Sequence, residues 1–359
     1  MIREKVVVAL SGGVDSSVAA LELKEQGYEV IGMTIKTWPK ELCDVVPKQQ
    51  TCCSTRDIED ARSVAAQLEI PFYVVEASEV FKAKVMNPFV DSYAQGRTPN
   101  PCVNCNRDIK CGILMDRADA LGVRFVATGH YARVEIDPST GRYLLKQGKD
   151  QDKDQSYVLC QITQKQLSRL LLPIGHLSKS EVRDRAKAAG LTVAEKPESQ
   201  ELCFIPDGNT KNFLKERTPI SFTFGEIVNQ RGEVLGRHQG IGAYTIGQRK
   251  GLGIAHPVPL YVLSIDTQAN RVVVGEQEAL ATPTCKVEQI HWTSMDKPTG
   301  PFPAEVKIRY RSRKLPAMLV PCETGVNVLF TEPVVDGISP GQAAVFYAGD
   351  TLLGGGWIA

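Results

Sequence analysis

Hydrophobic residues in the first part of the chain fall into short continuous runs separated by segments with helical spacing. Residues 5–10 (KVVVAL) form an apolar, β-branched run typical of a buried strand, and residues 16–26 show the pattern of a helix that ends at Gly27. Similar runs at 30–35 and 125–128 predict further strands, with helices between them. Because strands that alternate with helices form parallel βαβ units, the sequence predicts an α/β domain with a doubly wound parallel sheet.

The pattern changes along the rest of the chain. A turn at the centre of residues 132–148 predicts a β-hairpin, helical spacing dominates residues 154–190, and Ser178 begins a capping box within that segment. From about Thr218 onwards, short β-rich runs are separated by glycine and proline, which is typical of small all-β domains. The length of 359 residues also exceeds that of one ordinary core. We therefore expect three domains: the α/β domain at 1–204, a small central β-rich domain at 205–277 and a C-terminal β-barrel at 278–359.

Charge and hydropathy limit the partners of the protein. Lysine and arginine number 42 against 41 aspartates and glutamates, so the formal net charge is only +1, and nucleic acid would contact local basic patches. No run approaches the roughly 20 apolar residues of a membrane span, and the first residues show no signal-peptide pattern. We expect a cytoplasmic protein without membrane contact, in which clustered cysteines serve metal, redox or nucleophilic chemistry.

The segment SGGVDS, residues 11–16, lies between the first predicted strand and the first predicted helix. At such a position backbone N–H groups and the helix N-terminus favour an anion, two glycines let the backbone approach a phosphate, and serines add hydroxyl donors. Asp15 is unusual in a phosphate-binding loop unless it helps to hold Mg²⁺. Because no Gly-Lys-Ser/Thr follows, the loop is not a Walker A sequence. It resembles the PP-loop of ATP pyrophosphatases, which split ATP into AMP and pyrophosphate.

The cysteines form a second candidate site. Cys102 and Cys105 are separated by two residues, Cys111 follows on the same segment, and Cys203 lies about a hundred residues away. Three interpretations compete: a structural zinc site, a redox dithiol, and a sulfur-transfer site in which one cysteine carries a persulfide and another is the nucleophile. An ATP loop that activates an oxygen beside these thiols favours sulfur transfer. The remaining cysteines are expected to be buried hydrophobes at Cys160, Cys285 and Cys322, or to flank a loop near the sheet edge at Cys43, Cys52 and Cys53.

Several motifs along the chain carry a resemblance to a known family. In order, they are GRTPNPCVNCNRDIK, ATGHYAR, KDQSYVL, CFIPDGN, TIGQRKGLG, RYR and SPGQAAVFY. They span nearly the whole chain, which resembles the tRNA-specific 2-thiouridylases. The resemblance implies an enzyme that adenylates the C2 carbonyl of the wobble uridine in certain tRNAs and replaces its oxygen with sulfur. It also implies an ATP-pyrophosphatase domain, a small central domain and a C-terminal β-barrel, with ATP and Mg²⁺ as cofactors.

The resemblance assigns roles to residues by their position. Cys105 matches the catalytic cysteine, and Cys203 matches the persulfide-bearing cysteine. Positions that match the ATP site are Ala9, Leu10, Ser11, Gly12, Gly13, Val14, Asp15, Ser16, Ile35 and Gly129. Positions implied to contact the target base or the tRNA are Asn100, Pro101, Cys102, His130, Lys153, Asp154, Gln155, Arg309, Tyr310 and Gln342.

Cys102 departs from the family pattern. Much of the family has aspartate at this position, where it is suggested to act as a general acid or base, and a thiol cannot simply replace a carboxylate in that role. Cys102, Cys105 and Cys203 could instead hold a [4Fe–4S] cluster with one iron open to sulfide. The sequence therefore leaves two sulfur-transfer routes open, one through a persulfide and one through a cluster.

Basic residues indicate a surface for RNA. In EVKIRYRSRKLP, cations occupy alternate positions at Lys307, Arg309, Arg311 and Arg313, so a strand would place all of them on one face. We interpret this stripe as a phosphate-binding surface, with a solvated edge strand as the alternative. A second set recurs every four residues on the helix after Ser178 and is more simply an ordinary solvent-exposed face: Lys179, Arg183 and Lys187.

Three functions are compatible with these features. The first is a sulfurtransferase that acts on tRNA and receives sulfur from a donor protein, either a cysteine desulfurase or a sulfur-relay protein. The second is another PP-loop ATP-dependent ligase that acts on a small molecule, which leaves the thiols and the basic stripe unused. The third is a non-enzymatic zinc or iron–sulfur RNA-binding module, which leaves SGGVDS unexplained. The sequence favours the first.

Overall fold

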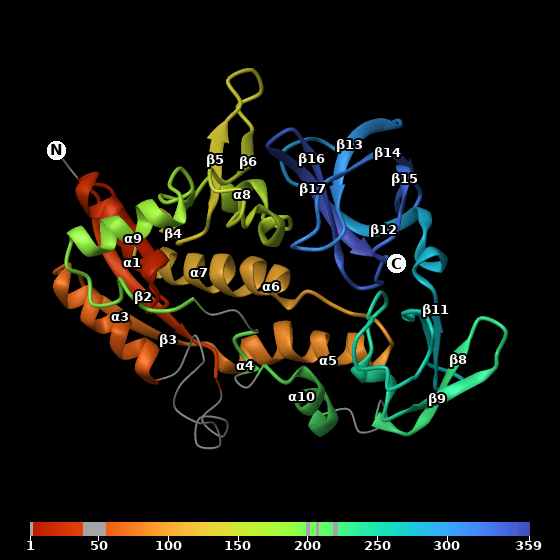
Figure 1. Ribbon diagram of the computed structural model, residues 1–359. Helices are drawn as coiled ribbons and strands as arrows, with labels where there is room; N and C mark the ends of the chain where they lie inside the picture. The colour runs from red at the N-terminus through yellow and green to blue at the C-terminus, as the bar shows by residue number, and fades with distance from the viewer. Residues whose placement is uncertain (1–2, 39–54, 199–201, 206–207, 218–221) are drawn as a thin grey trace.

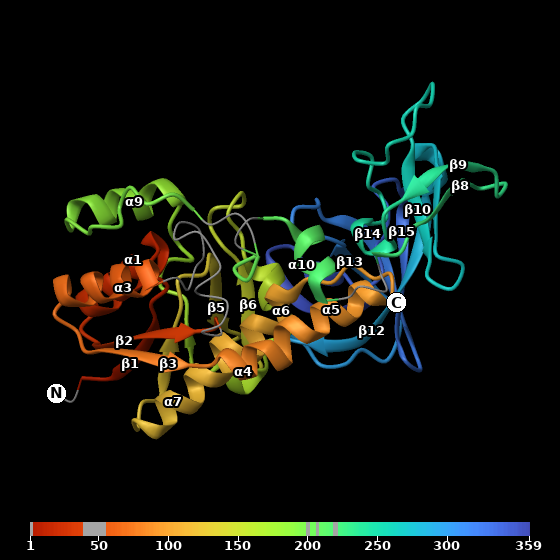
Figure 2. The same cartoon turned by 90° about the horizontal axis from the view of Figure 1, so that it is seen from below.

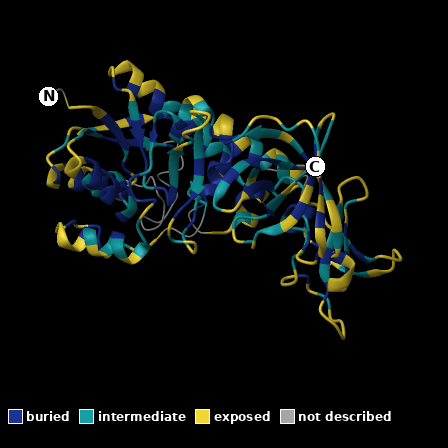
Figure 3. Cartoon of the chain, turned by 90° about the horizontal axis from the view of Figure 1, so that it is seen from above, coloured by how far each residue is buried: buried dark blue, intermediate teal, exposed yellow. Residues whose placement is uncertain are grey.

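The structure is a computed structural model that describes residues 3–38, 55–198, 202–205, 208–217 and 222–359. The parallel sheet and its helices lie at one end of the molecule, and the β-structure of the C-terminal half lies at the other (Figure 1). Buried residues fill the parallel sheet and the β-barrel, whereas exposed residues follow the outer helices and the loops (Figure 3). Within the described residues, no helix is long and apolar enough to cross a membrane.

Among the described residues, the N-terminal sheet has the strand order β3-β2-β1-β4-β7, and neighbouring strands are parallel. Its strands are β1 (Lys5–Ala9), β2 (Glu29–Lys36), β3 (Phe72–Glu76), β4 (Phe125–Ala127) and β7 (Leu170–Leu171). Val6, Val7 and Val8 of the central strand β1 are fully buried. A strand covered by helices on both faces has no polar side, which explains the continuous apolar run in the sequence.

Helices cover both faces of this sheet, so the predicted doubly wound α/β fold is confirmed. Figure 2 shows α1 (Val14–Glu25), α3 (Thr55–Gln67) and α9 (Lys179–Ala188) on one side and α7 (Leu114–Ala120) on the other. Helix α9 begins at the predicted capping box, in which Ser178 Oγ accepts the N–H of Glu181 and the Glu181 carboxylate accepts the N–H of Ser178.

The strand order reverses between β1 and β4. After β3 the chain crosses to the other side of β1, where β4 pairs with it. Ligands of open α/β sheets bind outside the carboxyl ends of the strands at such a reversal. Residues 11–16 follow β1, and residues 129–130 follow β4. The topology therefore brings two predicted ATP-binding segments to one edge of the sheet.

The thiols of the sequence motif lie at the start of a long helix. Residues 101–120 are continuously helical as α6 (Pro101–Asn104), the π-helical segment η2 (Cys105–Ile113) and α7. Because this helix ends where the chain turns into β4, its first residues point toward the carboxyl edge of the sheet. It is preceded by α4 (Ser78–Phe81), the π-helical segment η1 (Lys82–Met86) and α5 (Asn87–Ala94).

Residues 154–190 are less helical than their pattern predicts. They contain the 3₁₀ turn η3 (Ser156–Leu159), the short helix α8 (Gln164–Leu167), strand β7 and then α9. Strand β7 has only two residues, too few for a periodic signal, and it is held in the sheet by its pairing with β4. A further helix, α10 (Thr210–Arg217), precedes the β-rich part of the chain.

The central part of the chain forms a small sheet. Its strands are β8 (Gly225–Asn229), β9 (Val234–His238), β10 (Tyr261–Asp266) and β11 (Arg271–Gly275), in the order β10-β11-β8-β9 within the described residues. A separate core of its own includes Ile227, Val262, Val272 and Val274, all almost fully buried. Two 3₁₀ turns, η5 (Ile241–Ala243) and η6 (Gln277–Leu280), flank strands of this sheet.

The C-terminal part forms the predicted β-barrel. Residues 282–358 are all described, and six strands run through them: β12 (Thr282–Trp292), β13 (Phe302–Lys307), β14 (Leu315–Cys322), β15 (Gly325–Val334), β16 (Ala343–Ala348) and β17 (Thr351–Ile358). Pairing of β12 with both β15 and β17 closes the barrel. The predicted hairpin is also present, as β5 (Ala132–Ile136) and β6 (Tyr143–Gln147), but its strand β6 pairs with β17. The hairpin of the first domain thus extends the barrel sheet.

Candidate active site at the carboxyl edge of the sheet

The SGGVDS loop folds back on itself through its own side chains. Ser16 Oγ accepts the N–H of Ser11 at 3.1 Å and donates to the carbonyl of Gly13 at 3.1 Å. Gly12 has a φ of +73°, and a Cβ there would collide with the carbonyl of Asp57. Glycine is therefore required at this position both for its backbone conformation and for the space it leaves.

Gly129 packs directly on this loop from the neighbouring strand. A Cβ at Gly129 would lie 2.6 Å from the carbonyl carbon of Asp15 and from the nitrogen of Ser16. The structure thus brings the predicted ATP-binding residues after β1 and Gly129 together at the start of α1, where exposed backbone N–H groups favour an anion. Ile35 lies near the end of the adjacent strand β2, at the same edge of the sheet.

Asp15 is held by two groups that the sequence did not indicate. The Tyr131 hydroxyl donates to Asp15 Oδ1 at 2.7 Å, and Lys179 Nζ lies 2.7 Å and 2.8 Å from the two carboxylate oxygens. Burial and the charge of Asp15 both raise the pKa of Tyr131, so it remains a protonated donor. Lys179, interpreted from the sequence as part of a solvent-exposed face, is instead a residue of the candidate active site.

Lys196 holds the other side of the loop. Its ammonium group donates to the carbonyl of Gly12 at 2.9 Å and pairs with Asp57 at 2.6 Å, with Asp60 as a further partner. Burial would lower the pKa of Lys196, but Asp57 and Asp60 outweigh it and raise that pKa. Two lysines, Lys179 at the start of α9 and Lys196 after that helix, therefore place positive charge beside the predicted phosphate-binding loop.

The helix that carries the thiols is capped by the residues that precede it. Asn100 is its N-cap, with the side-chain oxygen accepting the N–H of Cys102 at 3.1 Å, and Pro101 occupies the first helical position. Cys102 is exposed in the first turn, and Cys105 is half-buried one turn later. The Asn-Pro pair, implied by the resemblance to contact the target base, thus also has a local structural role.

Cys105 and Cys203 lie against the same aromatic core although they are distant in sequence. Both pack on the cluster that includes Trp38, Phe89 and Phe204. Trp38 Nε1 donates to the carbonyl of Cys203 at 3.0 Å, which fixes the backbone of that residue. The fold therefore brings the two predicted sulfur-handling residues to one apolar environment.

Tyr310 packs against a second tyrosine. Its ring lies 5.9 Å from the ring of Tyr157. Burial raises the pKa of Tyr310, and the charges of Asp154, Cys102 and Glu198 raise it further.

The thiols do not fit an iron–sulfur cluster in this arrangement. In the part of the chain that the structure describes, which includes Cys102, Cys105 and Cys203, no group of three or more His, Cys, Asp or Glu side chains is placed to hold a metal ion. A cluster needs its thiolates gathered around one centre. Mg²⁺ differs from a cluster in its needs, because it takes one or two carboxylates and completes its shell with phosphates and water. Asp15 is the carboxylate of the loop, and its oxygens are paired with Lys179 and Tyr131.

The other described cysteines behave as buried thiols. Burial raises the pKa to about 12 for each of Cys111, Cys160 and Cys285. Cys111 and Cys160 are almost fully buried, as expected for small hydrophobic residues, whereas Cys322 is half-buried. Cys43, Cys52 and Cys53 lie outside the described residues.

The predicted basic strand is wrong beyond Lys307. Strand β13 ends at Lys307, and residues 308–312 form bends and turns, so period-two alternation does not apply to the remaining cations. Arg309 points inward, and its Nη2 donates to the carbonyls of Ile246 and Gly337 at 2.9 Å and 3.0 Å. Burial lowers the pKa of Arg309. Lys307 is half-buried, with its ammonium 6.0 Å from the centre of the Tyr310 ring.

Other residues implied to contact tRNA also have partners within the chain. Gln342 Nε2 donates to the carbonyl of Thr98 at 2.8 Å, which ties the barrel to the segment before the thiol helix. The buried carboxylate of Asp154 accepts the N–H of Gly148, and Gln155 Oε1 accepts the N–H of Tyr131. Lys153 is half-buried and pairs with Glu198 at 2.8 Å.

His130 is buried between the sheet and the thiol helix. Its Nδ1 lies 2.6 Å from Thr128 Oγ1, and its Nε2 lies 3.5 Å from Lys110 Nζ. Burial and the charge of Lys110 hold the pKa of His130 well below its ordinary value. The neutral ring therefore accepts from Lys110, and His130 links β4 to the helix that carries Cys105.

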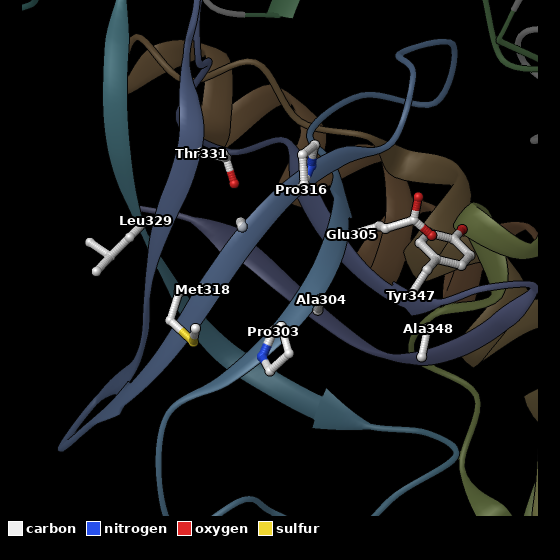
Figure 4. Close-up of a pocket in the computed structure, with 10 residues that line it drawn as sticks. Pro303, Ala304, Glu305, Pro316, Met318, Leu329, Thr331, Tyr347 and Ala348 are labelled. Atoms are coloured by element: carbon white, nitrogen blue, oxygen red, sulfur yellow. The ribbon is translucent and has the colours of Figure 1, made fainter.

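A surface cavity of about 560 Å³ lies on the C-terminal barrel, apart from these groups (Figure 4). Pro303, Met318 and Leu329 line it from neighbouring strands, and none of its lining residues is a predicted site residue.

Three family models match successive parts of the chain. The family described as tRNA methyl transferase HUP domain matches residues 4–207, the tRNA methyl transferase PRC-barrel domain matches 211–276, and the aminomethyltransferase beta-barrel domain matches 282–358. Together these descriptions name an α/β domain, a small central domain and a terminal barrel.

Full-length relatives have a different name from these domain descriptions. The chain is 50% identical over 99% of its length to a tRNA-specific 2-thiouridylase MnmA of Geotalea uraniireducens, covering 95% of that protein. It is 45% identical to that of Acetivibrio thermocellus, with 100% of both chains covered, and 48% identical to that of Geobacter metallireducens, with 99% and 97% covered. A solved 4-thiouridine synthetase–RNA complex with bound ATP aligns with a TM-score of only 0.38 at 18% identity, covering 60% of this chain and 50% of that one.

Proposed function

We propose, from the premise that this chain belongs to the family of tRNA-specific 2-thiouridylases, that it catalyses the ATP-dependent 2-thiolation of the wobble uridine of tRNA. The observation that carries the proposal is that Cys105 and Cys203 pack on one aromatic cluster. Cys105 lies on the helix whose first residues point toward the loop edge of the sheet. A small-molecule ligase would need the loop alone. Sulfur transfer also needs a persulfide that reaches the carbonyl carbon and a second thiol that reaches the sulfur of that persulfide.

The first step is adenylation of the uridine. The C2 oxygen attacks the α-phosphorus of ATP, and pyrophosphate leaves. The SGGVDS backbone and the N-terminus of α1 bind the phosphates, while Lys179 and Lys196 supply positive charge close to them. Asp15 is the residue that would hold Mg²⁺ here, on release from Lys179, and the ion would supply charge neutralisation for the leaving pyrophosphate.

The second step replaces the activated oxygen with sulfur. The terminal sulfur of a Cys203 persulfide adds at C2, and AMP leaves with the former C2 oxygen. The Cys105 thiolate attacks the remaining sulfur of Cys203, so that a Cys105–Cys203 disulfide forms and the transferred sulfur stays on the uridine as the thiocarbonyl. This disulfide is the oxidised product that balances reduction of the persulfide sulfur, and an external thiol must reduce it before the next cycle. A sulfur-donor protein, a desulfurase or relay protein, would reload Cys203.

The aromatic cluster suits this second step. Trp38, Phe89 and Phe204 are almost fully buried and exclude water from one side of the two thiols. A persulfide and an adenylated uridine both react with water or oxidants, so an apolar wall favours transfer over side reactions. We propose the persulfide route, and the lack of a group of three or more metal-binding side chains among the described residues supports this choice.

One assay tests the function. The protein is incubated with ATP, Mg²⁺, a persulfide donor and unmodified tRNA, and the nucleosides are examined by mass spectrometry for 2-thiouridine. A sulfur-for-oxygen exchange has a different mass from a methyl addition, so the assay also distinguishes the methyl transfer named in the domain descriptions. Asp15→Ala should abolish the product, while Asp116→Ala, at an exposed position of α7, is the matched control. Thiolation that persists in Asp15→Ala would contradict the proposal.

A further inference from the structure

A continuous line of alternating charge joins the turn at 153–155 to the nucleotide loop. Lys153 Nζ lies 2.8 Å from Glu198 Oε2, and Glu198 Oε1 lies 3.1 Å from Lys179 Nζ. Lys179 in turn lies 2.7 Å from Asp15 Oδ1. We call these four residues, Lys153, Glu198, Lys179 and Asp15, the ion-pair chain. It connects a residue implied to contact tRNA with a residue implied to contact ATP.

We infer that Glu198 and Lys179 are positioning residues that couple the binding of tRNA to the binding of Mg²⁺–ATP. This inference rests on the proposed function. It assigns roles to two residues that the sequence did not single out for catalysis, and neither is proposed to touch a reacting atom. They act through Lys153 at one end of the ion-pair chain and Asp15 at the other.

The two inner residues cannot change partners independently. Lys179 is the most buried member, with 12% of its side chain exposed, and it shares its charge between Asp15 and Glu198. Burial alone would raise the pKa of Glu198, but Lys153 and Lys179 together hold it below its ordinary value. A partly buried charge that loses one partner must strengthen its contact with the other, because an unpaired charge in such a place is costly.

The alternation of charge fixes the sign of the coupling. When Mg²⁺–ATP engages Asp15, Lys179 relies on Glu198, and Glu198 then holds Lys153 less strongly. Lys153 becomes available to an RNA phosphate. In the other direction, a phosphate that draws Lys153 away leaves Glu198 to Lys179, which releases Asp15 for Mg²⁺. Each ligand therefore favours the other, as thermodynamic reciprocity requires.

The positive sign of this coupling distinguishes the inference from simple electrostatics, which predicts negative coupling. ATP and tRNA are both anions, and two anions bound to one protein repel each other through its field. Positive coupling therefore needs contacts within the protein whose effect on the two affinities outweighs this repulsion. The three ion pairs from Lys153 to Asp15, each between 2.7 Å and 3.1 Å, supply such contacts.

The experiment measures tRNA affinity with and without nucleotide. An unmodified tRNA transcript is titrated against the full chain, with and without Mg²⁺ and α,β-methylene ATP, whose α–β bond is not cleaved. We expect the nucleotide to tighten tRNA binding by about 5-fold. This factor is near the low end for coupled sites, because the residues of the ion-pair chain are partly exposed to solvent. In Glu198→Gln the coupling should fall to less than about 2-fold.

Glu198→Gln also gives a signature that general damage would not produce. Loss of the carboxylate releases Lys153, so tRNA alone should bind more tightly. Lys179 is then left to Asp15, so Mg²⁺–nucleotide alone should bind more weakly. Opposite changes in two affinities are not expected from a destabilised fold. Lys179→Arg should retain part of the coupling and Lys179→Met should lose it.

The matched control is Glu195→Gln, because Glu195 pairs with Lys187 of the same helix at 2.9 Å but lies outside the ion-pair chain. It should keep the wild-type coupling. Absent or negative coupling in the wild type, or unchanged coupling in Glu198→Gln, would overturn the inference. A protein that binds both ligands with coupling but forms no 2-thiouridine would instead overturn the proposed function.

Discussion

Ion pairs surround the nucleotide loop, whereas aromatic side chains surround the two thiols. Asp15 is paired with Lys179, and Asp57 is paired with Lys196 on the other side of the loop. Cys105 and Cys203 instead pack on the cluster of Trp38, Phe89 and Phe204. Both environments belong to the one candidate site at the carboxyl edge of the sheet.

The difference matches the chemistry of the two proposed steps. Adenylation separates and moves negative charge, so it benefits from fixed cations and hydrogen-bond donors that need no reorganisation. Sulfur transfer proceeds through thiolates and a persulfide, so it benefits from an apolar wall that limits water and oxidants. A single chain can therefore hold both steps only by dividing its site into a charged part and an apolar part.

The largest expected effect on 2-thiouridine formation comes from mutations that each remove one part of the site. Cys105→Ser should lower 2-thiouridine formation by at least about 10³-fold, because the thiolate is needed to break the bond to Cys203. Release of pyrophosphate from ATP in a single turnover should persist in this variant. Asp15→Asn should lose both, since adenylation precedes sulfur transfer. Quantification of labelled pyrophosphate and of 2-thiouridine in parallel measures both steps.

Cys111→Ser is the control for Cys105→Ser. Cys111 lies on the same helix, but it is buried and has no role in the proposed sulfur transfer. If Cys105→Ser lost pyrophosphate release as completely as Asp15→Asn, the division of the site would be incorrect.

The fold was largely predictable because its signals are local. Apolar runs, the capping box at Ser178 and the glycines of the loop each depend on a few neighbouring residues, and the structure has them where the pattern places them. Strand β7 could not be predicted, because two residues show no period and only the pairing with β4 defines them. The pairing of the hairpin with β17 depends on residues about 200 positions away.

Motifs mark only part of the candidate site. The roles of the loop, Cys105 and Cys203 stay predictions, whereas the contacts of Lys179, Lys196 and Tyr131 with the loop were not predicted. Their contacts with the loop span 164, 184 and 116 residues, so no spacing in the sequence reveals them. The error at Arg309 has another cause: an argument from strand period fails where the strand ends, and β13 ends two residues earlier.

A smaller effect should be confined to the charged part of the site. Lys196→Met removes the cation that holds the Gly12 carbonyl and Asp57, so the loop loses its fixed position. We expect the KM for ATP to rise by about 10-fold, with a smaller change in the rate of sulfur transfer at saturating ATP. Steady-state kinetics with varied ATP checks this. Lys187→Met, which removes an exposed ion pair with Glu195, should leave both constants near wild type.

Cys102→Ser should have a still smaller effect. This variant tests whether sulfur transfer depends on a third thiol besides Cys105 and Cys203. In the persulfide route Cys102 carries no sulfur, and serine keeps its size in the first turn of the helix. We expect thiolation by iron-free protein to fall by less than about 10-fold, below the range for loss of a general acid or base. The assay uses a persulfide donor in air and records iron content. A loss of several orders of magnitude that tracks iron would favour the cluster route.

The smallest effect concerns His130, which joins the two parts of the site. Its folded pKa lies well below the ordinary value because of burial and then Lys110, whereas the unfolded chain titrates near 6.5. Below that pH the unfolded state binds more protons than the folded state, so the contribution of neutral His130 is present above about pH 6.5 and is lost as pH falls. One such group changes the free energy of unfolding by at most about 1.4 kcal/mol per pH unit.

Melting temperatures at pH 7.5 and 5.5 test this expectation. The wild type should lose more stability between these values than His130→Gln, even if the variant is less stable at both. A residual slope should remain in the variant, because burial also lowers the pKa of His238 and of His291. His256→Gln, at an exposed loop position, should keep the wild-type slope. Equal slopes in wild type and His130→Gln would mean that the contact between β4 and the thiol helix does not depend on a neutral imidazole.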